Sequence, residues 1–215
     1  MELFITESTC ACPVNGTLFL LSLKKNRYYS IQKSQAFYWQ RDGAFLKIHT
    51  TNKLGEQLIL QGLCTFSRCA QELWRDYSLK EELFLPEEIS YNISLTHYWN
   101  CFNSLRKSAK MLSKVFLREL KICFGLKQNK QNHTVSIEKL VYVYRQLRPY
   151  YPRAFNCLFD SVALRCFLET YGIFTHCIIA VKDEPFEAHA WLQKDNVVLN
   201  DTLEKTSLFS PILRF

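Results

Sequence analysis

The segment Asn156-Cys157-Leu158-Phe159-Asp160-Ser161-Val162-Ala163-Leu164 is an apolar run that continues to Tyr171 and stops at Gly172. Its length and apolar content indicate a buried helix, and glycine is a residue that commonly ends one. Cys157 would stand at the helix N-terminus, where unpaired N–H groups and partial positive charge favour thiolate over thiol. Cys157 is therefore the candidate nucleophile.

Two strand-like segments follow this helix, at residues 186–192 and 197–201; His189 lies in the first and Asp201 ends the second. If the loop between them is Lys194-Asp195-Asn196, His189 and Asp201 lie directly opposite on one face of a hairpin. Asn196 favours this loop because asparagine tolerates a positive φ. A two-residue loop would set His189 against Thr202 and turn Asp201 to the other face.

A thiol at a helix start, followed by an imidazole and a carboxylate on a hairpin, is the arrangement that nucleophilic acyl transfer requires. Asp201 would orient His189, and the N–H of Cys157 would be one oxyanion donor. The second donor stays open among Asn156, Tyr151 and Arg153. A single buried cysteine or strand histidine is more often packing than catalysis, but the ordered set favours catalysis.

Composition limits the rest of the chemistry. Cys157, His189 and Asp201 lack the compact spacing of a structural zinc site, and the sequence has no glycine-rich phosphate loop, so we expect no metal and no motif-bound cofactor. The net charge of +7 is either a solubility bias or an attraction to an anionic partner. Nine cysteines without a Cys-x-x-Cys pair, no secretion signal and no span-length apolar segment predict a soluble, cytoplasmic protein without membrane attachment.

The N-terminal part, residues 1–85, reads as a small module with a connector. We expect a strand at residues 2–6, two strands at residues 17–23 and 27–31 around a hairpin at Asn26, a helix from Ser34 to Trp39, and a second helix at residues 54–60 broken at Gly62. Strands followed by short helices favour a winged-helix-like module. A further helix is expected at residues 70–76, with the boundary to a second domain, residues 86–215, near Pro86.

A long central helix is predicted over residues 102–124, followed by one that Ser136 caps and that runs to residue 147. The central helix has an apolar stripe that comprises Phe102, Leu105, Ala109, Leu112, Phe116, Leu120 and Cys123. Its basic stripe comprises Lys107, Lys110, Lys114, Arg118 and Lys121. The basic stripe is either a solvated helix surface or a docking face for an acidic peptide, a nucleotide or a partner enzyme.

Cys157 to Leu164, Tyr171-Gly172-Ile173, residues 185–191 around His189, and Val198-Leu199-Asn200-Asp201 together resemble the transglutaminase-like leader peptidase of lasso-peptide biosynthesis, the B protein of microcin-type clusters. The resemblance implies an α+β fold with a C-terminal papain/transglutaminase-like cysteine peptidase domain. It also implies that Cys157, His189 and Asp201 form the catalytic triad.

The N-terminal half resembles, more faintly, the precursor-recognition element of the same pathway. That element is a winged-helix-like domain to whose sheet the leader peptide adds as a further strand. Its second and third strands would correspond to residues 18–23 and 27–31. The resemblance makes the backbone of Tyr28, Tyr29, Ser30 and Ile31 the receiving edge, by strand addition.

The implied activity is to bind the leader of a lasso-peptide precursor, cleave it from the core peptide, and pass the freed amine to an ATP-dependent macrolactam synthetase, the cyclase. The resemblance also implies that leader removal needs ATP. Two alternatives remain: an acyl-transferase or transglutaminase acting on a peptide, and a non-catalytic peptide- or nucleic-acid-binding protein. Nucleic acid is disfavoured because the basic residues concentrate on the central helix and not in a recognition helix.

Overall fold

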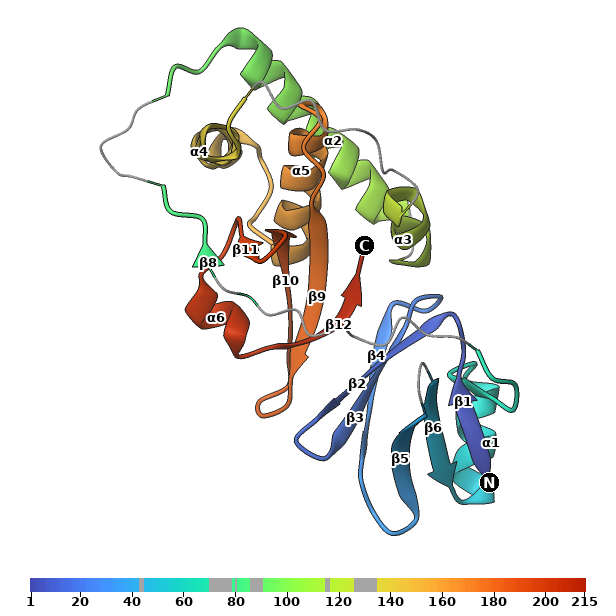
Figure 1. Ribbon diagram of the computed structural model, residues 1–215. Coiled ribbons are helices and arrows are strands. Elements are labelled where there is room, and N and C mark those ends of the chain that lie inside the picture. The colour runs from blue at the N-terminus through green and yellow to red at the C-terminus, as the bar shows by residue number, and fades with distance from the viewer. Residues whose placement is uncertain (43–44, 70–78, 80, 86–90, 115–116, 126–134) are drawn as a thin grey trace.

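The computed structural model describes residues 1–215 except 43–44, 70–78, 80, 86–90, 115–116 and 126–134 (Figure 1). Within the described residues, a β-rich N-terminal half leads into a C-terminal half of helices and one larger sheet. None of the described helices is long and apolar enough to cross a membrane.

The chain begins with a four-stranded antiparallel sheet in the order β5-β6-β1-β7. Its strands are β1 (Glu2–Ile5), β5 (Phe37–Asp42), β6 (Phe45–Thr50) and β7 (Cys64–Thr65), and α1 (Asn52–Leu60) follows β6. The prediction of α1 is confirmed, with Gly62 at φ 71° beyond its end. The helix predicted from Ser34 to Trp39 is wrong. The adjacent aromatic residues there suit a pleated, half-buried strand, and they form β5.

A three-stranded sheet, β2 (Thr9–Val14), β3 (Thr17–Ser22) and β4 (Arg27–Gln32), joins the two halves. Every residue of β3 is buried. Because side chains alternate along a strand, Leu18 and Leu20 enter the N-terminal core, whereas Phe19 and Leu21 enter the core shared with the C-terminal half. The predicted hairpin at Asn26 is confirmed, with φ 51°. Strand β2 is not among the elements predicted from the sequence.

The winged-helix-like arrangement is not seen in the described part of residues 1–85, which has two antiparallel sheets and a single helix, α1. That arrangement needs a helical pair, and one of the helices on which the expectation depended is a strand. The helix predicted at residues 70–76 and the boundary predicted near Pro86 lie outside the described residues.

The C-terminal half is built on a five-stranded sheet in the order β12-β9-β10-β11-β8. The strands are β8 (Glu81–Glu82), β9 (His176–Lys182), β10 (Glu187–Lys194), β11 (Val197–Val198) and β12 (Ser210–Arg214). The helices are α2 (Leu95–Lys114), α3 (Leu117–Gly125), α4 (Ile137–Leu147), α5 (Cys157–Glu169) and α6 (Leu203–Ser207), with a 3-10 turn η1 (Arg148–Tyr150) after α4. The helix expected over residues 102–124 corresponds to the described helices α2 and α3, and residues 115–116 between them lie outside the described residues.

The central position belongs to α5, which contacts α2, α4, β9 and β10 (Figure 1). Nearly all of its side chains from Phe159 onward are buried, as the apolar run predicts. Ser136 caps α4 as predicted, its hydroxyl accepting a hydrogen bond from the Lys139 N–H at 3.2 Å. Phe102 is 47% exposed, against the prediction that it is part of the buried stripe of α2, whereas Leu105 and Leu120 are buried. This packing holds the N-terminus of α5 against the middle of β10.

Candidate active site

The start of α5 is fixed by two reciprocal side-chain contacts. The side-chain oxygen of Asn156 accepts a hydrogen bond from the Phe159 N–H at 3.1 Å, and Asp160 accepts one from the Asn156 N–H at 2.8 Å. Asparagine is a favoured N-cap residue because it satisfies a backbone donor that the helix itself leaves unpaired. Cys157 is therefore the first helical residue, as the sequence predicts.

A buried arginine ties the preceding loop to this helix start. Arg148 is 2% exposed and forms an ion pair with Asp160. Its guanidinium also donates to the carbonyl oxygens of Tyr151, Arg153 and Ala154. A guanidinium offers several donors in a rigid plane, so one side chain can satisfy one carboxylate and several carbonyls together. The approach of the chain to Cys157 is thus set by Arg148.

The three residues predicted as a triad are brought together. His189 lies on β10, is 6% exposed, and its Nε2 is 2.5 Å from Oδ2 of Asp201. The thiol of Cys157 and the imidazole line the same pocket, close enough for hydrogen bonding to shift the pKa of both groups. Since Nε2 is engaged by Asp201, Nδ1 is the nitrogen left for the sulfur. The arrangement is thiol, imidazole and carboxylate in a row.

The electrostatics of the row favour an ion pair. The hydrogen bond with His189 lowers the pKa of Cys157; burial opposes this, and the N–H groups of Ala190 and Leu158 reinforce it. Burial alone would lower the pKa of His189, but the hydrogen bonds to Cys157 and Asp201 raise it above its ordinary value. A lowered thiol pKa beside a raised imidazole pKa is the condition for a thiolate–imidazolium pair.

The other cysteines behave differently. Burial raises the pKa of Cys12, Cys64, Cys101 and Cys177 to about 12, and it also raises that of Cys166. These thiols are packing groups, which is what the sequence predicts for them. Among the described cysteines with a resolved shift, the pKa moves down only at Cys157.

The hairpin that carries the histidine does not have the predicted register. Gln193 pairs with Val198, so the loop is the two residues Asp195 and Asn196, with the positive φ of 51° at Asp195. Continued regularly, this register would set His189 against Thr202, as the two-residue alternative states. The prediction of the loop is wrong. The contact between His189 and Asp201 nevertheless exists, because the chain leaves the sheet before it reaches Asp201.

Two side chains end the β10–β11 ladder. The Leu192 carbonyl still accepts from the Leu199 N–H, but the Leu199 carbonyl accepts from Arg145, on α4, at 3.2 Å. The Leu192 N–H donates instead to the side-chain oxygen of Asn200 at 2.6 Å. An asparagine amide thus takes the place of a backbone carbonyl, the strand ends, and Asp201 turns back toward His189.

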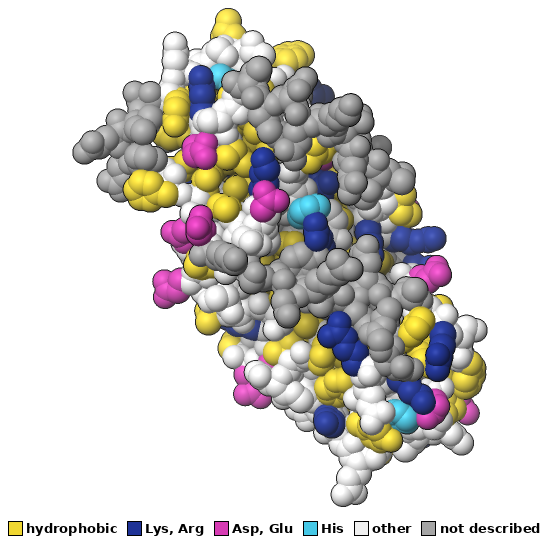
Figure 2. Space-filling view, viewed as in Figure 1, with side chains coloured by type: hydrophobic (Ala, Val, Ile, Leu, Met, Phe, Trp, Pro, Cys, Tyr) yellow, Lys and Arg dark blue, Asp and Glu magenta, His cyan; other side chains and the backbone are white. Residues whose placement is uncertain are grey.

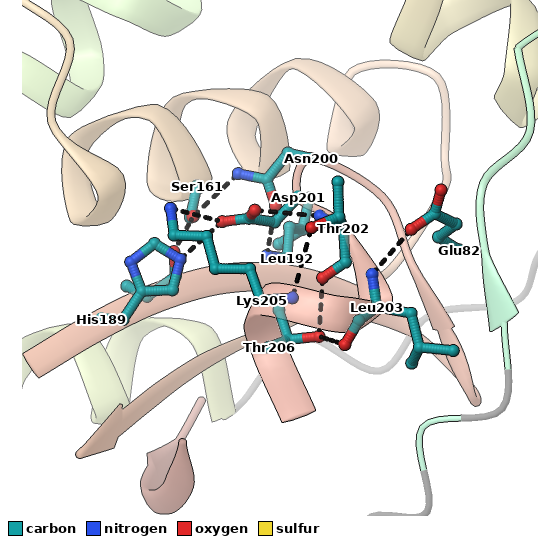
Figure 3. A network of polar contacts seen from close by, with 11 residues as sticks. Glu82, Ser161, His189, Leu192, Asn200, Asp201, Thr202, Leu203, Lys205 and Thr206 are labelled. Atoms are coloured by element: carbon teal, nitrogen blue, oxygen red, sulfur yellow. Dashed lines mark hydrogen bonds and ion pairs between the residues drawn. The ribbon is translucent and has the colours of Figure 1, made fainter. Parts of the chain in front are cut away.

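Asn200 is in turn fixed to the catalytic helix. Its side-chain nitrogen donates to the hydroxyl of Ser161 at 3.0 Å, and Ser161, which is fully buried, donates to the Ala190 carbonyl at 3.3 Å. Figure 3 shows these side chains converging between α5 and the hairpin. The roles of Asn200 and Ser161 were not predicted from the sequence, because neither follows from periodicity.

Three further residues surround the His189–Asp201 pair. The rings of Phe209 and Trp191 lie 5.2 Å and 6.2 Å from the imidazole, so apolar side chains cover it. Lys205, one turn after Asp201 on α6, places Nζ 3.4 Å from Oδ2 of Asp201 (Figure 3). Phe209 and Lys205 were not anticipated from the sequence.

A pocket of about 330 Å³ opens beside the thiol. Its walls include Cys157, His189 and Asp201, an apolar side with Phe155, Tyr144 and Leu164, and a polar side with Arg145, Asn200 and Lys205. Of the three candidate oxyanion donors, Asn156 lines the pocket, whereas the rings of Tyr151 and Phe102 pack together and Arg153 lies over Phe159. No metal-ligand cluster of His, Cys, Asp or Glu occurs among the described residues.

The residues predicted to receive a leader lie on β4, which pairs with β3 on one side and has no strand on its other side among the described residues. The Lys33 N–H donates to the Gly16 carbonyl, so in this antiparallel register every second residue, including Tyr29 and Ile31, directs its backbone toward β3. The backbone groups of Tyr28 and Ser30 therefore point outward.

A comparison with protein families matches residues 104–214 to the transglutaminase-like superfamily, a segment that contains Cys157, His189 and Asp201. Comparisons with curated proteins and with solved structures return no match. The matched segment is more than half of the chain, and it coincides with the part in which a helix-start thiol meets an imidazole on a neighbouring hairpin. The chain belongs to the transglutaminase-like superfamily.

Proposed function

We propose that this chain is a cysteine endopeptidase that binds the leader of a ribosomally made lasso-peptide precursor and cleaves it from the core peptide before macrolactam closure. Membership of the superfamily suggests cysteine-peptidase or acyltransferase-like chemistry. The finer assignment draws on the resemblance to leader peptidases. The observation that carries the proposal is the contact in which His189 Nε2 lies 2.5 Å from Oδ2 of Asp201, in a pocket that Cys157 also lines.

The chemistry follows from the row. The thiolate of Cys157 attacks the carbonyl carbon of the scissile bond, and the oxyanion accepts a hydrogen bond from the Cys157 N–H at the helix N-terminus. His189 gives its proton to the leaving amine, which departs as the new N-terminus of the core peptide. Water then loses a proton to His189 and attacks the thioester, which releases the leader with a free carboxylate and restores the thiolate–imidazolium pair.

The edge of β4 supports leader binding as an added strand. An extended peptide could pair with the outward backbone groups of Tyr28 and Ser30 without disturbing the pairing of β3 with β4. The ring of Tyr28 lies 5.7 Å from that of Phe186, just before β10 begins. A leader on this edge would therefore lie near the strand that carries His189. We infer that the freed amine then passes to the ATP-dependent cyclase.

A non-catalytic nucleic-acid binder fits less well. On the face drawn in Figure 2, lysines and arginines are scattered among apolar and acidic side chains and do not form one basic stripe. A lowered thiol pKa and a buried His–Asp pair also have no use in that function.

The test uses the purified chain and a precursor peptide, sought among the short reading frames that neighbour its gene. Cys157→Ala should abolish cleavage and leave the affinity for the leader unchanged, while Cys69→Ala, a partly exposed cysteine outside the row, should cleave as the wild type does. Cleavage by the Cys157→Ala chain would refute the assignment. Mass spectrometry of the leader separates the two chemistries, because hydrolysis leaves a free carboxylate and acyl transfer leaves an amide.

A further inference from the structure

The outer face of α2 carries an apolar stripe that nothing described covers. Leu95, Tyr98, Trp99 and Phe102 follow the i, i+3, i+4, i+7 spacing of one helix face. They are 86%, 51%, 69% and 47% exposed, respectively. The face of α2 that packs on α5 is a different one, with Cys101 and Leu105 buried. Exposed contiguous aromatic surface on a soluble domain usually marks a binding site.

This stripe contacts the loop that borders the catalytic pocket. The ring of Phe102 lies 5.6 Å from that of Tyr151, in the loop that Arg148 fixes. That loop ends in Phe155, which is 71% exposed, lines the pocket, and lies two residues before Cys157. We call Leu95, Tyr98, Trp99, Phe102, Tyr151 and Phe155 together the aromatic track.

The track is rigid where it meets the pocket. The Arg148 guanidinium lies 4.4 Å from the centre of the Phe155 ring, and this arginine is itself buried and paired with Asp160. A ring held in this way loses little conformational freedom when a ligand covers its other face. Phe155 therefore has the properties of a preformed subsite wall for an apolar side chain.

From this continuity we propose that the aromatic track binds apolar side chains of the same polypeptide whose scissile bond lies at Cys157, extending substrate recognition from the pocket along α2. The proposal depends on the proposed function, since it needs a polypeptide substrate. The occupant is the substrate because the track begins inside the catalytic pocket, so any chain bound at the thiol and leaving on that side must cross Phe155. Aromatic rings bury large apolar area with few rotatable bonds, which suits a surface that must hold an extended peptide.

The test compares two peptides on the full chain: the whole precursor, and a short peptide that keeps only the few residues around the cleaved bond. Trp99→Ala should raise KM for the whole precursor by about tenfold with kcat nearly unchanged, because one aromatic side chain loses its contact area. The penalty should be smaller for the short peptide, and Trp99→Phe should restore most of the loss. Leu60→Ala, which removes an 84% exposed side chain from α1, should leave both substrates unaffected.

Each other outcome has a separate meaning. Equal penalties on both peptides, or no penalty on either, would overturn the proposal while leaving the peptidase assignment intact. If the wild type cleaves neither peptide, the proposed function itself fails. Light scattering on the same variants measures the oligomeric state. If the wild type is a dimer and Trp99→Ala dissociates it, the aromatic track binds a second copy of the chain, and the proposal of substrate binding is overturned. Thermal unfolding confirms that the variants fold.

Discussion

The side-chain nitrogen of Asn200 lies 3.0 Å from the hydroxyl of Ser161, and this contact connects the two elements that carry the reacting residues. Ser161 is one turn after Cys157 on α5, and Asn200 directly precedes Asp201. The same asparagine bonds to the backbone of β10 three residues after His189. Thiol, imidazole and carboxylate are therefore positioned by one amide side chain, though it contributes none of their chemistry.

Replacing this amide should impair turnover more than binding. In Asn200→Ala, the Leu192 N–H loses its acceptor and Asp201 is no longer held in its turn toward His189. We expect kcat to fall by on the order of tenfold to a hundredfold, the range for small misplacements of reacting groups, with KM nearly unchanged. Steady-state kinetics on the precursor peptide measure both constants.

The matched variant is Ser161→Ala, which removes the hydroxyl but leaves the bond between Asn200 and Leu192. Its kcat should lie between those of the wild type and Asn200→Ala. If KM rises and kcat is unaffected in both variants, the pair serves substrate binding and not the orientation of Asp201.

The contact between His189 and Asp201 was predicted from the sequence, but the backbone conformation that produces it was not. Their contact could be predicted from residue order and strand pattern. The predicted route, a three-residue hairpin loop, is wrong: the loop has two residues, and Arg145 and Asn200 end the ladder. A side chain that replaces a backbone acceptor depends on a helix distant in the sequence, so no local pattern of residues indicates it.

In the N-terminal half, too, elements that local residues mark are predictable, whereas an element that depends on tertiary pairing is not. The hairpin at Asn26 and helix α1 are predictable because a turn residue and a glycine mark them locally. The segment Phe37-Tyr38-Trp39 was assigned to a helix from a serine cap, although its aromatic residues favour a strand. Tertiary pairing with β6 decides this segment, and pairing partners are not visible in a single sequence.

Arg148 should be among the most important residues for stability. Arg148→Met removes one half of a buried ion pair. The carboxylate of Asp160 and the carbonyl groups of Arg153 and Ala154 then lack the guanidinium that donates to them. Breaking a buried pair in this way costs about 3–5 kcal/mol of unfolding free energy. Denaturant titration measures the loss.

The control for Arg148 is Arg153→Met. Arg153 also lies over the Phe159 ring, at 4.3 Å, but its side chain is exposed. An exposed contact of this kind contributes about 0.5–1 kcal/mol. Similar losses in the two variants would mean that the ion pair with Asp160 adds nothing to the aromatic contact.

Strand addition of the leader to β4 can be tested at its edge. Ser30→Pro removes an N–H that points away from β3, a position where an edge strand tolerates proline. If the leader pairs there, its affinity for the Cys157→Ala chain should fall about fivefold, the equivalent of one hydrogen bond. Ser30→Ala keeps the N–H and should bind normally. Equal binding by all three chains would exclude this edge.

The pH profile should report the charge on His189. The thiolate–imidazolium pair exists above the lowered pKa of Cys157 and below the raised pKa of His189, so activity should fall on both sides of that window. In Asp201→Asn, the imidazole loses the negative charge of its hydrogen-bond acceptor, and that charge raises the pKa of His189. The alkaline limb should move to lower pH, and turnover should fall less than in His189→Ala.

Replacing Lys205 should move the alkaline limb of the pH profile in the opposite direction. Its positive charge lowers the pKa of His189, so Lys205→Gln should move the alkaline limb to higher pH. The shift should shrink as salt is added, because this side chain is 50% exposed and its field is screened. The pH dependence of kcat/KM, together with the rate of Cys157 alkylation by iodoacetamide, measures both variants. Shifts in the same direction would mean that the alkaline limb belongs to a group other than His189, because a single imidazole must respond oppositely to losing a neighbouring anion and a neighbouring cation.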